Sequence, residues 1–91
     1  MIIASQIRAA RALLGLSQSA LADLADIGIA TVKRIELSSE ISGSARTVWK
    51  LQTALERAGV EFIPADDHKG PGVRLKERAR TKPRRGRTQA G

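Results

Sequence analysis

The chain contains no cysteine, one histidine, and no apolar run long enough to cross a membrane. Without cysteine there is neither a disulfide framework nor a thiolate metal site, and His68 alone cannot build a zinc centre without several carboxylate partners. A membrane span needs about 18 consecutive apolar residues, and the N-terminus lacks a basic leader before an apolar stretch of signal-peptide length. We therefore expect a cytoplasmic protein that holds no metal or other cofactor and enters no membrane.

Motifs of catalysis are equally scarce. No glycine-rich phosphate loop follows a predicted strand, and no serine stands in a recognisable nucleophile setting. Asp66, Asp67 and His68 are adjacent in a loop flanked by Pro and Gly, where a solvated turn is favoured over a metal or proton-transfer site. A chain of 91 residues allows one compact domain and leaves little room for a substrate cleft. We expect neither an enzyme nor a small-molecule substrate.

Charge is distributed unevenly along the chain, whose net charge is +7. Residues 1–63 carry seven Lys and Arg against six acidic residues, whereas residues 64–91 carry nine against three. Most of the net charge therefore lies in a C-terminal arm. Because Lys and Arg predominate after Leu75 and apolar residues are almost absent, residues 76–91 are predicted to be a disordered tail. Such an arm either binds nucleic-acid phosphate or only keeps the protein soluble.

Apolar periodicity predicts four helices in the first part of the chain. They span about residues 6–14, with Ser5 as N-cap and Gly15 as terminator, 18–25 after Ser17, 29–37, and 45–58 before Gly59. The side chains expected to face the core are Ile7, Ala10, Leu14, Leu21, Leu24, Ala25, Val32, Ile35, Val48, Leu51, Leu55 and Ala58. Trp49 falls beside the apolar stripe of the fourth helix, where covering the domain's own core is favoured over anchoring a dimer.

Two short β-prone stretches follow the helices. Residues 60–63 end at Pro64, and residues 73–75 form the second stretch across an intervening loop, so a hairpin is possible. We divide the chain into a helical domain with a short strand at 1–63, a loop with a possible second strand at 64–75, and the tail at 76–91. The expected fold class is mainly α, with four helices, a short strand or hairpin, and a disordered basic tail.

The second and third predicted helices are separated by a three-residue break, Asp26-Ile27-Gly28, which is typical of a helix-turn-helix. Where two such helices cross, the first needs a small side chain and the second a β-branched or aliphatic one. Ala22 and Val32 satisfy these demands. Leu21 and Ile35 are predicted to extend the same contact into the core.

Two runs, GLSQSALA at residues 15–22 and IATVKRIE at residues 29–36, resemble the xenobiotic-response-element/Cro/CI family of helix-turn-helix regulators. The resemblance covers roughly residues 6–58 and implies a lambda-repressor-like domain. It also implies a transcriptional regulator that binds double-stranded DNA as a homodimer, with the second motif helix in the major groove. The expected role is that of a repressor reading an inverted repeat through residues 29–37.

The resemblance also implies which residues contact DNA. Ser17 and Gln18 match positions where the first motif helix meets the phosphate backbone, and a helix N-terminus favours phosphate. Lys33 suits guanine acceptors, and Thr31 suits a hydrogen bond or a thymine methyl group. The full set of base-facing and groove-wall positions is Ile29, Ala30, Thr31, Lys33 and Arg34. The predicted phosphate contacts of the arm are Arg78, Arg80, Lys82, Arg84 and Arg85.

The sequence departs from the family pattern at the turn. Asp26 stands where glycine is usual and must reach a positive φ, and Gly28 replaces a hydroxyl cap. Ile29 and Ala30 are apolar where polar side chains are frequent, so direct base readout is expected to be sparse. The alternative is a protein-binding antiactivator or antitoxin-like module that uses the same scaffold.

Two structural expectations complete the resemblance. Arg11 and Glu36 match a family pair and are predicted to form a partly buried ion pair between the first and third helices. The dimer interface is left open, because the fourth helix with Trp49 and the strand at 60–63 are both candidates.

Overall fold

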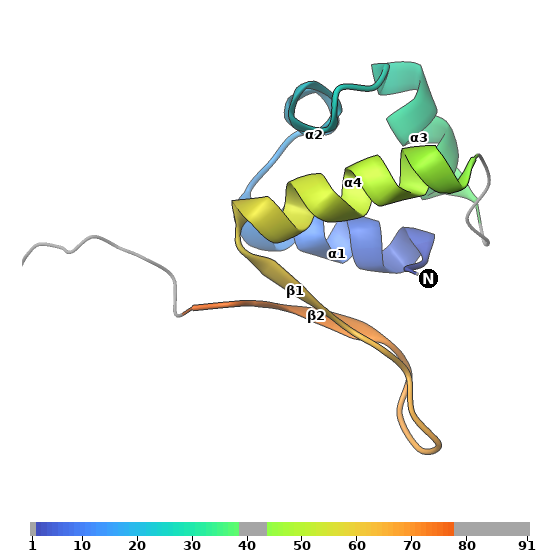
Figure 1. The fold of residues 1–91 in the computed structure, drawn as a ribbon, viewed down its shortest axis with the longest axis vertical. Coiled ribbons are helices and arrows are strands. Elements are labelled where there is room, and N and C mark those ends of the chain that lie inside the picture. Colours follow the sequence, from blue (N-terminus) through green and yellow to red (C-terminus); the bar gives the residue numbers. More distant parts are fainter. Residues whose placement is uncertain (1, 39–43, 78–91) are drawn as a thin grey trace, which may run out of the picture.

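The computed structural model describes residues 2–38 and 44–77. Its elements are α1 (Ala4–Leu14), α2 (Gln18–Ala25), α3 (Ile29–Leu37), α4 (Ala45–Ala58), β1 (Val60–Ile63) and β2 (Gly72–Leu75). Helices α1 and α4 lie alongside each other, α2 and α3 cover one side of them, and the two strands lie on the other side (Figure 1). This arrangement confirms the expected fold class of four helices followed by a short strand pair. None of the helices in the described ranges is long and apolar enough to span a membrane.

Local capping signals set the bounds of α2 and α4. The side-chain oxygens of Ser17 and Ser44 each accept a backbone N–H from the first turn of their helix, at 3.0 and 3.1 Å. Gly15 and Gly59 follow α1 and α4 with φ of 69° and 119°, a region that favours glycine because it lacks a Cβ. The bounds predicted for the second, third and fourth helices are confirmed. Of the predicted loop before α4, residues 39–43 lie outside the described residues.

The start of α1 corrects the sequence prediction. Ser5 lies inside the helix, and the N-cap residue is Ile3. The cause is Gln6, whose Oε1 accepts the backbone N–H of Ile3 at 2.9 Å. Gln6 is buried, and its Nε2 donates to the carbonyl oxygens of Gly72 at 2.9 Å and Ile63 at 3.4 Å. One amide side chain therefore caps α1 and joins it to both strands.

The two strands form an antiparallel hairpin in which Val60 lies opposite Leu75. Val60 is fully buried beneath the helices, which gives the hairpin an apolar inner face. On the outer face, Glu61 accepts a hydrogen bond from Arg74 Nε at 2.8 Å. This hydrogen bond and the positive charge of Arg74 hold the pKa of Glu61 below its ordinary value. The hairpin that the sequence left as a possibility is confirmed.

The core lies where the four helices meet, above β1. Ala22 and Val32 are 3% and 0% exposed, and Leu21 and Ile35 are fully buried with them, so the predicted helix-crossing contact is confirmed. The rest of the buried apolar cluster consists of Ile2, Ile7, Ala10, Ala25, Val48, Leu51, Leu55 and Val60.

Three apolar side chains that the sequence assigns to the core are exposed instead. Leu24 is 55% exposed, Trp49 is 63% exposed, and Ala58 is also on the surface. Helix α2 buries the narrow side formed by Leu21, Ala22 and Ala25, which turns Leu24 away from the core. Helix α4 similarly buries one narrow stripe, so the prediction that Trp49 covers the core is wrong.

Candidate nucleic-acid interface

The turn between α2 and α3 depends on Asp26. Its φ of 57° places it in the left-handed region, and no other non-glycine residue among those described has a positive φ. Aspartate tolerates this region better than most side chains. The turn brings the N–H of Ile27 to the carbonyl of Ala22 at 3.0 Å. Gly28 then begins α3 with an ordinary φ of −75° and no side-chain cap, so the helix-turn-helix forms despite both departures from the family pattern.

The inner side of α3 is held by Glu36, which is 4% exposed. Arg11 of α1 donates twice to the carboxylate, through Nε at 3.0 Å and Nη2 at 3.1 Å. Two such parallel bonds fit the geometry of guanidinium and carboxylate. Gln18 of α2 donates its Nε2 to the same group at 3.0 Å. The structure thus brings the predicted pair Arg11 and Glu36 together, and the carboxylate links three helices.

Further polar contacts hold the C-terminal end of α3. Arg8 donates its Nη1 to the carbonyl oxygen of Glu36, and Ser38 Oγ donates to that of Arg34 at 3.0 Å. The positive charge of Arg8 near the C-terminal end of α3 also interacts favourably with the helix dipole. The role of Arg8 was not predicted, although its position three residues before Arg11 places both on one side of α1. The structural role of the Gln18 side chain was not predicted either, because the sequence offers no local signal for it.

The outer side of α3 carries the residues predicted to face DNA. Ile29, Ala30, Lys33 and Arg34 are exposed, and Thr31 is half-buried. The only acidic residue of α3 is Glu36, whose carboxylate is buried and paired. The exposed side of α3 therefore presents two cations and no carboxylate of its own.

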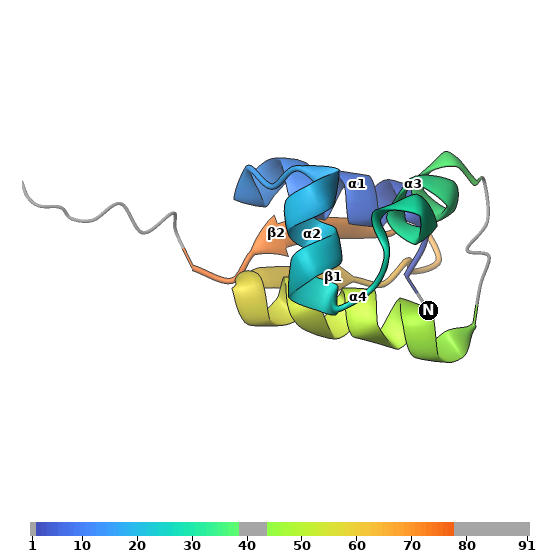
Figure 2. The same ribbon diagram turned by 90° about the horizontal axis from the view of Figure 1, so that it is seen from above.

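Helix α2 places its N-terminus near the same surface. In Figure 2, α2 crosses over α1 and α4, and α3 lies next to it on the same side of the molecule. Ser17 is exposed at the start of α2, whereas Gln18 is half-buried because its amide turns inward to Glu36. The predicted phosphate-facing and base-facing residues are thus on two packed helices whose mutual position is fixed by a buried carboxylate.

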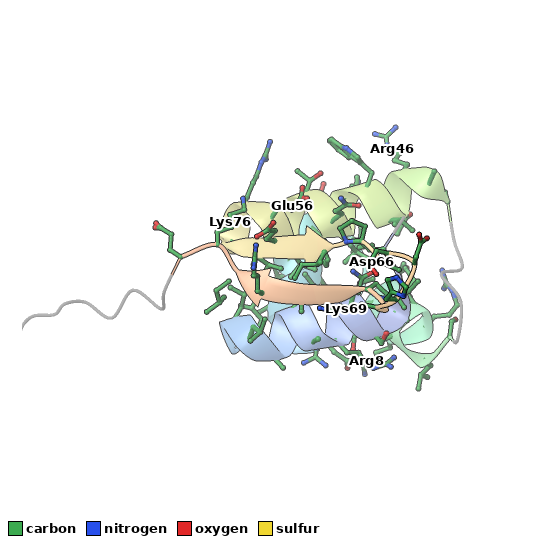
Figure 3. The ribbon with its side chains drawn as sticks, turned by 90° about the horizontal axis from the view of Figure 1, so that it is seen from below. Arg8, Arg46, Glu56, Asp66, Lys69 and Lys76 are labelled. Carbon is green, nitrogen blue, oxygen red and sulfur yellow. The ribbon has the colours of Figure 1, made fainter. Side chains whose placement is uncertain are left out.

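Asp66 organises a turn in the loop of the hairpin. Asp66 Oδ1 accepts the backbone N–H groups of His68 at 2.8 Å and Lys69 at 2.7 Å. Asp66 and Lys69 lie at the end of the hairpin, well separated from the start of the arm (Figure 3). Within residues 2–38 and 44–77, no group of three His, Cys, Asp or Glu side chains is placed to hold a metal ion.

The basic arm leaves the fold from a fixed point. The backbone N–H of Lys76 donates to the carbonyl of Gly59 at 2.8 Å, which ties the end of β2 to the end of α4. The predicted phosphate contacts of the arm, Arg78, Arg80, Lys82, Arg84 and Arg85, lie outside the described residues.

Comparison with known proteins agrees with this geometry. A family model described as Helix-turn-helix matches residues 7–62, which include most of α1, all of α2, α3 and α4, and most of β1. A search of curated proteins found no match to the chain. The family match covers more than half of the chain and includes the motif, the buried pair and the exposed side of α3. The chain belongs to the helix-turn-helix family of the XRE/Cro/CI type, a family of DNA-binding transcriptional regulators.

Proposed function

We propose that this protein is a sequence-specific repressor that binds double-stranded DNA as a homodimer, with α3 of each subunit in the major groove of an inverted repeat. The observation that carries the proposal is the division of charge on α3. Lys33 and Arg34 are exposed, while the single carboxylate of the helix, on Glu36, is buried. Because phosphate contacts dominate DNA affinity, a helix without exposed negative charge suits the groove.

Each exposed residue of α3 has a proposed role. Lys33 donates to guanine acceptors, and Arg34 contacts the phosphates at the groove wall. Thr31 donates or accepts one hydrogen bond, and Ile29 and Ala30 make apolar contacts with thymine methyl groups. Much of the remaining sequence preference then comes from DNA shape and deformability.

Helix α2 is proposed to position the protein on the backbone. The first N–H groups of a helix favour phosphate, and Ser17 and Gln18 open α2. Since the Gln18 amide nitrogen is engaged by Glu36 at 3.0 Å, we assign the phosphate contact to the Gln18 backbone N–H. The arm residues add sequence-independent phosphate contacts, each of which steepens the salt dependence of log K by about 0.9.

A protein-binding role, as in an antiactivator or antitoxin-like module, is the second candidate. Ile29 is 41% exposed and Leu37 is 87% exposed, so both ends of α3 present apolar surface. Apolar surface of this kind suits a protein partner better than phosphate. The two candidates differ in whether α3 selects a DNA sequence.

The deciding experiment is selection from a random duplex DNA pool with the full chain at physiological salt. The proposal predicts an inverted repeat with half-sites about one helical turn, or 34 Å, apart. Lys33→Ala combined with Thr31→Ala should abolish the enrichment, and Lys69→Ala, which removes an exposed cation from the hairpin loop, should leave it unchanged. Replacing the five named arm cations with Gln should lower affinity and salt dependence but preserve the motif. If no motif is enriched and binding disappears with the arm cations, α3 does not read DNA.

A further inference from the structure

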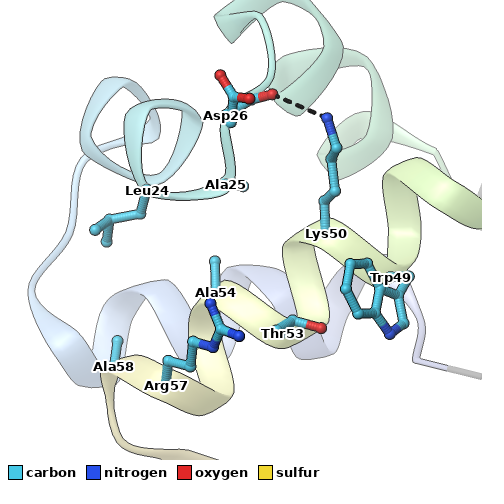
Figure 4. A pocket seen from close by; sticks show the side chains of 9 residues that line it. All are labelled: Leu24, Ala25, Asp26, Trp49, Lys50, Thr53, Ala54, Arg57 and Ala58. Carbon is cyan, nitrogen blue, oxygen red and sulfur yellow. Dashed lines mark hydrogen bonds between the residues drawn. The ribbon is translucent and has the colours of Figure 1, made fainter.

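A groove between α2 and α4 lies outside the surfaces described so far. It has a volume of about 370 Å³ and is lined by nine residues from the end of α2, the following turn and the C-terminal two-thirds of α4 (Figure 4). Leu24 and Trp49 stand at its sides, and the small side chains of Ala54 and Ala58 leave space between the helices. The groove is at the end of α2 opposite to Ser17, where the proposed phosphate contact is made.

The two large apolar side chains that line the groove, Leu24 and Trp49, take no part in the core. Leu24 and Trp49 remain 55% and 63% exposed although the core cluster is complete without them. Single exposed apolar residues are ordinary on protein surfaces, but two large ones on adjoining helices border one hollow here. Trp49 is also the only tryptophan of the chain, and exposed tryptophans are typical anchors of protein interfaces.

The charge beside the groove is mainly positive. Lys50 and Arg57 line it, and Arg46 lies one turn before Lys50 on the same helix. Among the described residues, no acidic side chain lies within ion-pair distance of Arg46 or Arg57. Within residues 2–38 and 44–77, the single hydrogen bond of Lys50 Nζ goes to the backbone carbonyl of Asp26, at 3.4 Å. Arg46 and Lys50 are four residues apart, a spacing at which like charges repel unless negative charge is brought between them.

We propose that this groove binds an acidic amphipathic segment of another protein, with an apolar side chain between Leu24 and Trp49 and carboxylates against Arg46, Lys50 and Arg57. Charge complementarity decides between the occupants. A second copy related by a two-fold axis would bring the same patch of three cations against its own copy. The groove's lining offers only the Asp26 carboxylate to offset this repulsion. Nucleic acid would match the cations but leave Leu24 and Trp49 uncovered. The proposed site does not depend on DNA binding, and DNA selection enters its test only as a check that Arg57 belongs to the groove and not to the DNA-binding surface.

The test uses the full chain and three synthetic helical peptides of about 15 residues, or four turns, all lacking tryptophan. The first is amphipathic with Leu on one face and Glu on the other, the second replaces Glu with Lys, and the third replaces Leu with Ser. Binding is followed by anisotropy of labelled peptide and by Trp49 emission, which reports on the groove alone because the chain has one tryptophan. We expect saturable binding of the first peptide with a blue shift, and binding at least about tenfold weaker for the other two.

Three variants locate the site. Arg57→Glu and Arg46→Glu should each weaken the first peptide about tenfold, whereas Lys69→Glu, with the same charge change on the hairpin loop, should leave its affinity unchanged. Trp49→Ala should also weaken binding without a change in the circular dichroism spectrum, since the ring is 63% exposed. Equal binding of the acidic and basic peptides, or indifference to both arginine variants, would overturn the proposal. So would loss of dimers in sedimentation on Trp49→Ala, which would show a second copy in the groove, or loss of DNA selection in Arg57→Glu.

Discussion

Two arginine–glutamate pairs in this protein have nearly the same geometry and very different surroundings. Arg11 Nε lies 3.0 Å from Glu36, and Arg74 Nε lies 2.8 Å from Glu61. The side chains of the first pair are 25% and 3% exposed, and those of the second are 67% and 47% exposed. Water screens the second pair and already solvates both partners, so its net contribution is small. The contributions of the two pairs to stability therefore differ because of their burial and not because of their contact distances.

The pairs also differ in what they join. Glu61 and Arg74 lie directly opposite each other on β1 and β2, two strands that their backbone hydrogen bonds already join. Glu36 connects α3 to α1 through Arg11 and to α2 through Gln18, so its loss would affect the position of the proposed recognition helix. Four variants test this contrast, in order of decreasing effect.

Glu36→Ala should have the largest effect. Removing the carboxylate leaves the mostly buried guanidinium of Arg11 without its partner, which is expected to cost about 3–5 kcal/mol of unfolding free energy. Denaturant unfolding followed by circular dichroism measures this loss, with Glu61→Ala as the matched control for the exposed pair. A loss below about 1 kcal/mol would mean that burial does not separate the two pairs.

Gln6→Leu tests whether a buried neutral anchor behaves like the buried ion pair. The substitution leaves the Ile3 N–H and the Gly72 carbonyl without their side-chain partner, and we expect a cost of about 1–3 kcal/mol. Faster hydrogen exchange at the amides of β2 should accompany it. Gln52→Leu is the control, because among the residues that the structure describes this half-buried side chain bonds only to Glu56 of the same helix, at 3.3 Å. Similar losses for the two variants would argue against the role of Gln6 as an anchor.

Arg11→Met combined with Glu36→Leu should cost at least about 2 kcal/mol less than Glu36→Ala alone, since no unpaired charge remains buried. The same unfolding measurement on the single variants Arg11→Met and Glu36→Leu completes a double-mutant cycle. A double variant as unstable as Glu36→Ala would show that the unpaired charge of Arg11 is not the cause of the loss, and that hydrogen bonds lost with the carboxylate, such as the one from Gln18, carry the effect.

Glu61→Gln should have the smallest effect. The lowered pKa of Glu61 means that its contribution to stability is present above the ordinary value of 4.5 and is lost as the pH falls through the lower pKa of the folded state. Wild type and variant should thus differ marginally at pH 7 and converge in acid, in parallel thermal melts across this range. A large difference at pH 7, or one that grows in acid, would contradict the assignment of this pair as a screened surface contact.

Local signals explain why most of the fold was predictable. The side chains of Ser17 and Ser44 cap the starts of α2 and α4, and the backbone of Gly59 ends α4. The local sequence is therefore sufficient to predict these helix ends. The pairing of Arg11 with Glu36 was accessible only through family resemblance, because 25 residues separate them.

The errors arose where a side chain's environment is set by distant segments. Leu24 fits the apolar periodicity of α2 and Trp49 borders the apolar stripe of α4, but which of two neighbouring faces is buried depends on how the two helices cross. Ser5 has the residue type of a cap, yet Gln6 caps α1 because the hairpin packs against it. A signal for Gln6 did exist, since it lies four residues before the buried Ala10 and so places an amide on the apolar face of the helix.

The hydrogen bond from Gln6 to Gly72 joins residues 66 positions apart in the chain. It therefore bears on folding during synthesis as well as on the stability of the folded protein. During synthesis the chain emerges from its N-terminus, so α1 and the helix-turn-helix leave the ribosome well before β2. The amide of Gln6 must stay hydrated, or bonded elsewhere, until Gly72 arrives. A nascent chain that already contains the whole DNA-binding motif thus still lacks its closing contact, and its final stability comes only when the hairpin that follows the motif is complete.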